Sequence, residues 1–318
     1  MNTRYVYDPN CLSEKRDIRR RSNSVACTLI LCEILATLLS LGITLLLPAF
    51  GVNVQSLSDD LIYSEIMNAC IMSIAMTLPF CFMVFLLKNK SEITPVFSKP
   101  RTDPSTTVYY CLFAILLTYV AGAFTSLISS FFEIFAGVEP YTPQLGEKYS
   151  DPVSAFIVSI ICSCLLPAMC EEFAFRGIIF GTLRRFGDRS AIIVSALLFG
   201  LLHGNFVQLP YTFVMGVGLA YITVRTGSIY PAMIVHFTNN TLATVNEWLP
   251  DFAGVLSLVL LGLSVFAAVM LSRRRALIKS PDAPSYFSGA QRTRMILLSP
   301  IIIIYAVLQI LTSVYYLR

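Results

Sequence analysis

Charged residues are scarce in this sequence, and histidine and tryptophan are rarer still. Aspartate, glutamate, lysine and arginine together make up 13% of the 318 residues, and there are two histidines and one tryptophan. Because a soluble domain carries about 25% charged residues, this scarcity excludes an ordinary soluble fold. No basic patch with interleaved aromatic residues is present and the net charge is only +4, so we expect no nucleic-acid partner.

Two motifs of metal and disulfide chemistry are also missing. The sequence contains no HExxH zinc-peptidase motif and no CxxC pair. Eight of the nine cysteines lie inside apolar stretches, which indicates free buried thiols. No cleavage site of small residues follows the first apolar stretch, so we interpret that stretch as a retained membrane span rather than a signal peptide.

Apolar residues are abundant and gather in long stretches. Hydrophobic residues make up 56% of the chain, and the mean hydropathy is +0.71. A membrane-spanning helix needs about 20 apolar residues. The sequence therefore predicts an all-α, polytopic membrane helix bundle with about eight or nine transmembrane helices. Nine stretches are candidates: 25–47, 62–87, 108–135, 154–186, 191–204, 206–224, 229–248, 252–271 and 295–316.

The basic residues predict how the chain is oriented. With the N-terminus inside, 20 of the 23 lysines and arginines lie in segments on the inner side. Lys148 and Arg318 lie on the outer side, and Arg176 lies within a span. Short inner loops carry an excess of basic residues in membrane proteins, so this asymmetry favours an N-terminus inside.

We expect four regions along the chain. Residues 1–24 form a basic cytoplasmic tail and residues 25–150 form three N-terminal transmembrane helices. Residues 151–248 form a core that carries the polar motifs, and residues 249–318 form the C-terminal transmembrane helices with a basic inner loop. Within the core, Pro167 is expected to kink or break the long stretch 154–186, because proline removes a helical hydrogen bond.

The sequence EEFAFR at 171–176 places two carboxylates and a guanidinium in an apolar stretch. A charge at the bilayer centre costs about 2.5 to 3.5 kcal/mol on the mildest scale, so such groups are paired or functional. Glu172 and Arg176 are four residues apart and share a helix face, which predicts an ion pair between them. Glu171 points about 100° away from Glu172 around the helix and is the freer carboxylate.

Both histidines also lie in predicted spans. His236 and Asn240 are four residues apart on one helix face, where their hydrogen-bond donors are suited to hold a developing oxyanion. His203 lies beside the small pair formed by Gly200 and Gly204. At about 1.5 Å per residue, these polar groups lie about 16 to 22 Å from the nearest inner basic residues, which places them at a common depth.

Three motifs, on the predicted spans 154–186, 191–204 and 229–248, now suggest a family. EEFAFR matches ExxxR with a doubled glutamate, Phe199 to His203 matches FxxxH, and His236 to Asn240 matches HxxxN. In this order they resemble the CPBP family of intramembrane proteases, which includes CAAX prenyl endopeptidases and bacteriocin-processing or self-immunity proteins. The match covers about 151–245.

The resemblance implies a role for each motif residue. It implies that Glu171 and His203 activate a water, with Glu171 as the general base, and that His236 and Asn240 stabilise the oxyanion. Glu172, Arg176 and Phe199 match motif positions for which the resemblance implies a structural role. We expect no cofactor, although Glu171, His203 and His236 are also a ligand set for catalytic zinc.

Two other classes of function stay open. One is a catalytically silent membrane scaffold or bacteriocin-immunity protein that keeps the fold and acts by binding. The other is a proton-coupled transporter, since chains of ionisable groups in membranes also mark pumps. The expected partners are the lipid bilayer and a membrane-associated protein or peptide substrate; the oligomeric state is open. The expected location is a multi-pass membrane protein, in the plasma membrane if the chain is bacterial.

Overall fold

The structure is a computed structural model that describes residues 9–58, 60–86, 94–136, 152–273 and 285–315. In these ranges the chain is helical and contains no strand, which confirms the predicted all-α class. The helical elements are α1 (Pro9–Leu46), η1 (Leu47–Phe50), α2 (Val54–Ser58), α3 (Leu61–Leu86), η3 (Thr94–Phe97), α4 (Pro104–Ala136), α5 (Pro152–Ser159), η4 (Ile160–Leu165), α6 (Leu166–Glu172), η5 (Phe173–Ile179), α7 (Phe180–Arg184), α8 (Asp188–Leu202), α9 (Gln208–Thr226), α10 (Tyr230–Trp248), α11 (Pro250–Arg273), α12 (Gly289–Leu297) and α13 (Pro300–Tyr315).

Several of these helices are able to cross a bilayer, so the chain is an integral membrane protein. Among the described residues, five stretches are long and apolar enough, and a sixth is added if α12 and α13 form one bent span. The five stretches are Asn10–Phe50, Ile62–Leu86, Pro104–Phe131, Pro152–Arg184 and Pro250–Arg273. Helices α8, α9 and α10 lie where three further spans were predicted, but they fall short of this test. The number of crossings and the inner N-terminus stay predictions.

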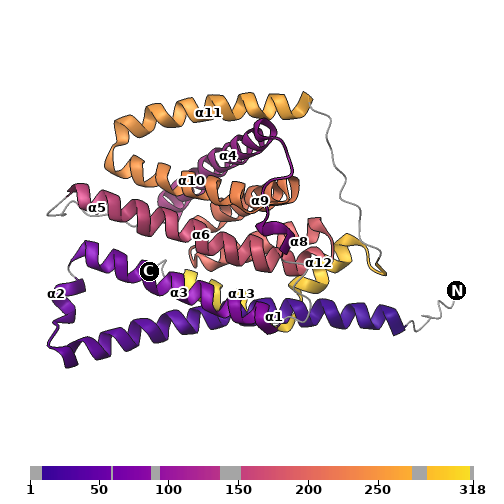
Figure 1. The fold of residues 1–318 in the computed structure, drawn as a ribbon, viewed down its shortest axis with the longest axis horizontal. Coiled ribbons are helices and arrows are strands. Elements are labelled where there is room, and N and C mark those ends of the chain that lie inside the picture. The colour runs from indigo at the N-terminus through magenta and orange to yellow at the C-terminus, as the bar shows by residue number, and fades with distance from the viewer. Residues whose placement is uncertain (1–8, 59, 87–93, 137–151, 274–284, 316–318) are drawn as a thin grey trace.

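Figure 1 shows the helices in two groups that meet along the middle of the molecule. The first group contains α1 and α3, joined through α2, with α13 packed against α1. In the second group α8 packs against α9, α9 against α4, and α4 against α11. The run from α5 to α7 lies between the groups and contacts α3 on one side and α10 on the other. The polar motifs of this run therefore face helices from both groups.

The run from α5 to α7 is one helical stretch, 152–184, with two π-helical segments, η4 and η5. Pro167 lies in the first turn of α6, directly after η4. Proline has no backbone N–H, so the carbonyl of Ser163, four residues earlier, receives no α-helical hydrogen bond from position 167. The expected disturbance at Pro167 is therefore a π-helical widening within one continuous helix. Such widenings are frequent at functional sites.

Both ends of the described chain differ from the predicted spans. Helix α1 begins at Pro9, inside the predicted tail, where Asp17 and Arg21 form an ion pair of 3.2 Å across one helical turn. The predicted last span, 295–316, is instead two helices, α12 and α13, bent by 62°. The bend follows from Pro300, which disfavours helical geometry at Ser299 before it. The predicted boundary at 150/151 and residues 274–284 of the basic inner loop lie outside the described residues.

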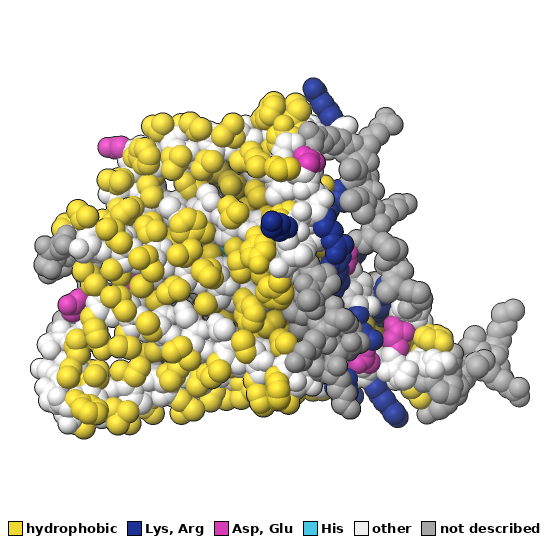
Figure 2. Space-filling model, in the orientation of Figure 1, with side chains coloured by type: hydrophobic (Ala, Val, Ile, Leu, Met, Phe, Trp, Pro, Cys, Tyr) yellow, Lys and Arg dark blue, Asp and Glu magenta, His cyan; other side chains and the backbone are white. Residues whose placement is uncertain are grey.

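The surface is divided between an apolar face and a basic edge. Figure 2 shows hydrophobic side chains over most of this face and lysines and arginines gathered at the edge where α12 lies and α1 begins. Large apolar side chains such as Leu38, Phe85, Leu127 and Leu258 are more than half exposed, as expected for helices that face lipid.

Candidate active site

The ion pair between Glu172 and Arg176 lies at the centre of the site. Arg176 Nη1 lies 2.8 Å from Glu172 Oε1, and neither side chain is exposed to solvent. The predicted pairing is therefore confirmed. Arg176 also donates from Nη2 to the carbonyl of Gly216 on α9, at 3.2 Å. A Cβ at Gly216 would lie 3.0 Å from the Cα of Ala196, a tight contact, so the glycine favours the close approach of α9 to α8.

His236 on α10 contacts both glutamates. Its Nδ1 lies 2.9 Å from Glu172 Oε1, and its Nε2 lies 3.9 Å from Glu171 Oε2. The ring is 3% exposed. Because a carboxylate accepts hydrogen bonds, Nδ1 carries the proton at the Glu172 contact, and Nε2 faces Glu171. His236 thus bridges the two adjacent carboxylates of EEFAFR.

Glu171 differs from Glu172 in its exposure. Its side chain keeps 20% of its surface exposed, whereas that of Glu172 keeps none. The buried oxygens Glu171 Oε2 and Glu172 Oε2 accept no hydrogen bond within the described part of the chain. Two carboxylates with one guanidinium leave excess negative charge in a low-dielectric site, where it interacts strongly with any proton or polar group that enters.

Phe199 on α8 packs at the centre of the motif residues. Its ring centroid lies 5.9 Å from that of His236 and 5.0 Å from that of His203, both edge-on. The guanidinium of Arg176 lies over the same ring, 4.5 Å from its centroid. A cation over an aromatic face is attracted to the ring, so Phe199 offsets part of the cost of burying Arg176.

His203 lies at the end of α8, apart from the glutamates. Its Nδ1 lies 2.9 Å from the carbonyl oxygen of Phe199, and the chain turns at Gly204, whose φ is +55°. Between the described residues, no hydrogen bond or ion pair joins His203 to Glu171 or Glu172. The predicted His203–Glu171 partnership is therefore not assembled in this structure, where His236 lies next to Glu171 instead.

Asn240 lies one turn beyond His236 on α10. Its Nδ2 donates to the carbonyl of Ser163, at 3.3 Å, and its Oδ1 lies 3.5 Å from Nδ2 of Asn239. The Ser163 carbonyl is the one that Pro167 leaves without an α-helical donor. The side chain of Asn240 therefore satisfies a backbone group exposed by the π-helical segment, which fixes α10 against η4.

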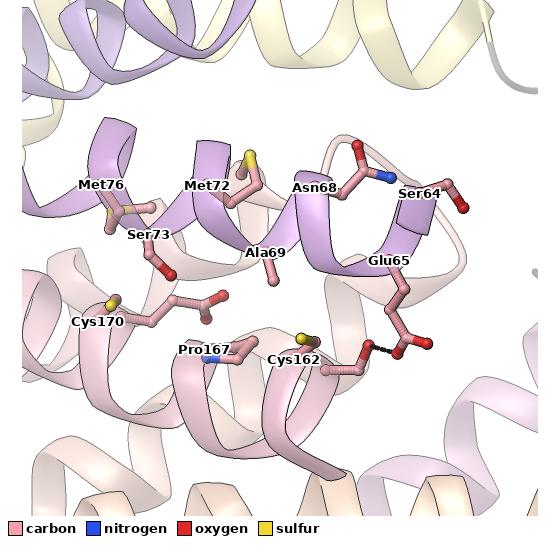
Figure 3. A pocket seen from close by; sticks show the side chains of 12 residues that line it. Ser64, Glu65, Asn68, Ala69, Met72, Ser73, Met76, Cys162, Pro167 and Cys170 are labelled. Atoms are coloured by element: carbon pink, nitrogen blue, oxygen red, sulfur yellow. Dashed lines mark hydrogen bonds between the residues drawn. The ribbon is translucent and has the colours of Figure 1, made fainter. Parts of the chain in front are cut away.

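A pocket of about 450 Å³ opens beside Glu171, between α3 and the run of η4 and α6. Glu65 on α3 lies at one end of it and Cys170 at the other (Figure 3). Glu65 accepts hydrogen bonds from the hydroxyls of Ser163, at 2.7 Å, and Ser159, at 3.0 Å. Glu171 is the only one of the four predicted catalytic residues that lines this pocket.

Comparison with known proteins shows which family the segment around the site resembles. Residues 153–242 match the family model "Type II CAAX prenyl endopeptidase Rce1-like". Over this segment the chain is similar to that family, and residues 153–242 are called the Rce1-like segment below. The matched segment holds all seven motif residues, and the resemblance expected from the three motifs is confirmed.

Two bacterial proteins are similar over a longer stretch. "Putative membrane peptidase YdiL" of Bacillus subtilis (strain 168) is 28% identical over 142 residues, which is 42% of this chain and 57% of the relative. "Membrane-embedded CAAX protease MroQ" of Staphylococcus aureus (strain USA300) is 28% identical over 175 residues, 51% of this chain and 66% of the relative. The chain thus spans less than two thirds of each curated relative. No solved structure matches it significantly.

The alternative zinc ligands of the Rce1-like segment do not converge. Among the described residues, no group of three or more His, Cys, Asp and Glu side chains is placed to hold a metal ion. Glu171 and His236 are neighbours, but His203 faces a different cavity, beside α1 and α13. The set of Glu171, His203 and His236 is therefore not assembled as a ligand set in this structure.

Two glutamates outside the Rce1-like segment line cavities but were not predicted as site residues. Glu65 on α3 lines the pocket of Glu171, and Glu33 on α1 lines the cavity of His203. Each is a carboxylate inside a predicted span, which by itself marks a functional candidate. That signal was present in the sequence, but neither residue belongs to a motif.

Proposed function

We propose that the protein is an intramembrane endopeptidase of the CAAX type that hydrolyses a peptide bond in a membrane-associated protein or peptide. The observation that carries the proposal is His236, held between two carboxylates within the bundle, one of which lines an open pocket. Ionisable groups are expensive in a membrane, so a buried cluster of this kind is expected to have a function. The Rce1-like match and the names of both bacterial relatives support the same activity.

In the proposed reaction Glu171 is the general base. It takes a proton from water, and the hydroxide attacks the carbonyl carbon of the peptide bond to give a tetrahedral oxyanion. Glu171 then returns the proton to the leaving nitrogen, and the C–N bond breaks. Its Oε2, which accepts no hydrogen bond from the described residues, and its place in the pocket suit this role. On the resemblance, we propose that His203 completes the water site in the substrate-bound state.

His236 and Asn240 are the proposed donors to the oxyanion. Because Nδ1 of His236 is engaged by Glu172, the ring donates to an oxyanion through Nε2 only when it is protonated. The carboxylate of Glu172 stabilises that imidazolium as negative charge develops on the substrate. Asn240 donates through Nδ2 once this group is released from the carbonyl of Ser163.

The decisive experiment is cleavage of a fluorogenic membrane peptide by purified protein in detergent. Wild type is compared with Glu171→Gln, with and without a chelator. Loss of the general base is expected to lower kcat by about 10² to 10⁴ without unfolding the protein. Glu133→Gln, the same change at an exposed position on α4, is the matched control. Equal turnover by wild type and Glu171→Gln would contradict the proposal.

The samples with chelator test whether the activity requires a metal ion. We propose a metal-free mechanism, so activity is expected to survive chelation. Activity that is lost with chelator and restored by zinc would instead make Glu171, His203 and His236 metal ligands.

The other readings predict different results. A silent scaffold or bacteriocin-immunity protein would cleave no peptide of any sequence, and a proton-coupled transporter would drive uptake in sealed vesicles. For location we propose the plasma membrane, since both relatives come from bacteria.

A further inference from the structure

A second polar cavity, of about 470 Å³, lies beside His203. Its walls come from α1, from the end of α8 and from α13, so most of it is built from helices outside the Rce1-like segment. Its polar lining consists of Glu33, His203, Tyr305, Gln309 and Thr312. No motif of the sequence predicts this cavity.

The cavity presents hydrogen-bond acceptors. Glu33 Oε1 accepts a hydrogen bond from Gln309 Nε2, at 3.2 Å, which leaves Glu33 Oε2 as a further acceptor. His203 Nδ1 carries a proton when it bonds to the carbonyl of Phe199, so Nε2 of the neutral ring is an acceptor. Gln309 adds its amide oxygen. Among the residues that the structure describes, no lysine or arginine lines the cavity.

Tyr305 is an independent sign that something polar enters. Its side chain is completely buried, and its hydroxyl has no hydrogen-bond partner within the described chain. A buried hydroxyl that is left without a hydrogen bond destabilises the folded protein. A ligand that reaches this hydroxyl would therefore recover a hydrogen bond that the protein alone does not make.

We propose that this cavity binds a primary ammonium group, with Glu33 as its counter-ion. An ammonium ion is donor-only, with three N–H groups, and so complements the carboxylate of Glu33, the amide oxygen of Gln309 and the phenol oxygen of Tyr305. The apolar walls, including Ile34 and Leu308, suit the alkyl chain that carries it. The inference rests on the proposed function for the source of the group, which is a lysine side chain or the amino terminus of the peptide substrate.

Because the chain has only two histidines, ligand binding at His203 can be tested by NMR without measuring turnover. Full-length protein labelled with ¹⁵N-histidine in nanodiscs gives two imidazole signals, and the His203→Gln variant identifies that of His203. Hexylammonium is expected to shift the His203 signal with saturation, whereas the neutral isostere 1-hexanol is not. The shift is expected to disappear in Glu33→Gln and to persist in the control Glu133→Gln.

Other outcomes overturn the proposal. An equal shift with hexanol, no shift with either probe, or an unchanged shift in Glu33→Gln would show that no ammonium site is present. Should Glu33→Gln fail to fold, Tyr305→Phe serves instead, and it is expected to weaken hexylammonium binding about fivefold or more, as for the loss of one charge-assisted hydrogen bond. Unchanged binding in Tyr305→Phe would also count against the site.

Peptides then distinguish the sources of the group. One pair carries lysine or norleucine in an acetylated peptide, and the other carries a free or acetylated amino terminus without lysine. In each pair the charged member is expected to bind about tenfold more tightly if it is the source, and Glu33→Gln removes the preference. No preference in either pair would overturn the role in substrate recognition. Failure of cleavage alone would refute the endopeptidase and leave the hexylammonium result unchanged.

Discussion

The two histidines of the chain lie in contrasting surroundings, although Phe199 contacts both. His236 lies inside a helix, with both ring nitrogens directed at carboxylates and almost no exposed surface. His203 lies at a helix end, with one nitrogen engaged by a backbone carbonyl and a cavity beside it. Glu171, Glu172 and Phe199, which contact His236, all belong to the Rce1-like segment, whereas the cavity beside His203 depends on α1 and α13. The motifs therefore account for these contacts of His236 but for only part of the lining around His203.

Near His236, the largest loss of stability is expected when one partner of the buried ion pair is removed. Arg176→Met leaves Glu172 charged and buried, and the loss of one partner of such a pair costs about 3 to 5 kcal/mol of unfolding free energy. Thermal unfolding in nanodiscs measures the effect. The double variant Glu172→Gln with Arg176→Met removes both charges and is expected to be more stable than Arg176→Met alone; a less stable double variant would contradict this.

Replacing each histidine tests the comparison itself. His236→Ala is expected to lower both the melting temperature and activity, because it removes the partner of Glu172. His203→Ala is expected to lower activity by about 10² while the melting temperature stays close to wild type, since its ring has one protein hydrogen bond. Peptide cleavage and thermal unfolding of the same preparations provide the measurements. A larger loss of stability in His203→Ala would reverse our assignment of roles.

A smaller effect is expected where α3 joins the core. Glu65→Gln keeps the shape of the side chain but weakens the hydrogen bonds from Ser159 and Ser163, at a cost of about 1 kcal/mol. Since Ser163 also holds Asn240, the variant is expected to lower kcat more than it raises KM. Glu133→Gln is the control. A change in KM alone would indicate that Glu65 contacts substrate and does not position Asn240.

The smallest effect concerns an exposed charge outside both sites. Hydrogen bonds from Ser105 and Thr106 hold the pKa of Asp103, at the start of α4, well below its usual range. A lowered pKa contributes stability above the unfolded pKa, and this is lost as pH falls through the folded pKa. The melting temperature of Asp103→Ala is therefore expected to lie slightly below wild type at pH 7. The gap is expected to persist to about pH 4 and to close only in stronger acid; a gap that already closes at pH 6 would refute this.

Much of the fold was predictable because hydrophobicity alone decides where a membrane helix lies. Helices occupy each of the nine predicted positions, and Glu172 pairs with Arg176 as their spacing requires. The bend before α13 was not predicted, and the kink or break expected at Pro167 is instead the π-helical segment η4. Both depend on how neighbouring helices accommodate a proline. The placement of His203 was not predictable either, since α1 and α13 lie far from it in sequence.

The ion pair within EEFAFR has a consequence for how the protein is made. Glu172 and Arg176 lie on the same helical run, four residues apart, whereas His236 is 64 residues downstream. When the ribosome delivers the segment 152–184 to the membrane, Arg176 already has its counter-ion Glu172 within the same helical run. Pairing of the buried arginine therefore does not depend on α10, whereas assembly of the site around His236 does.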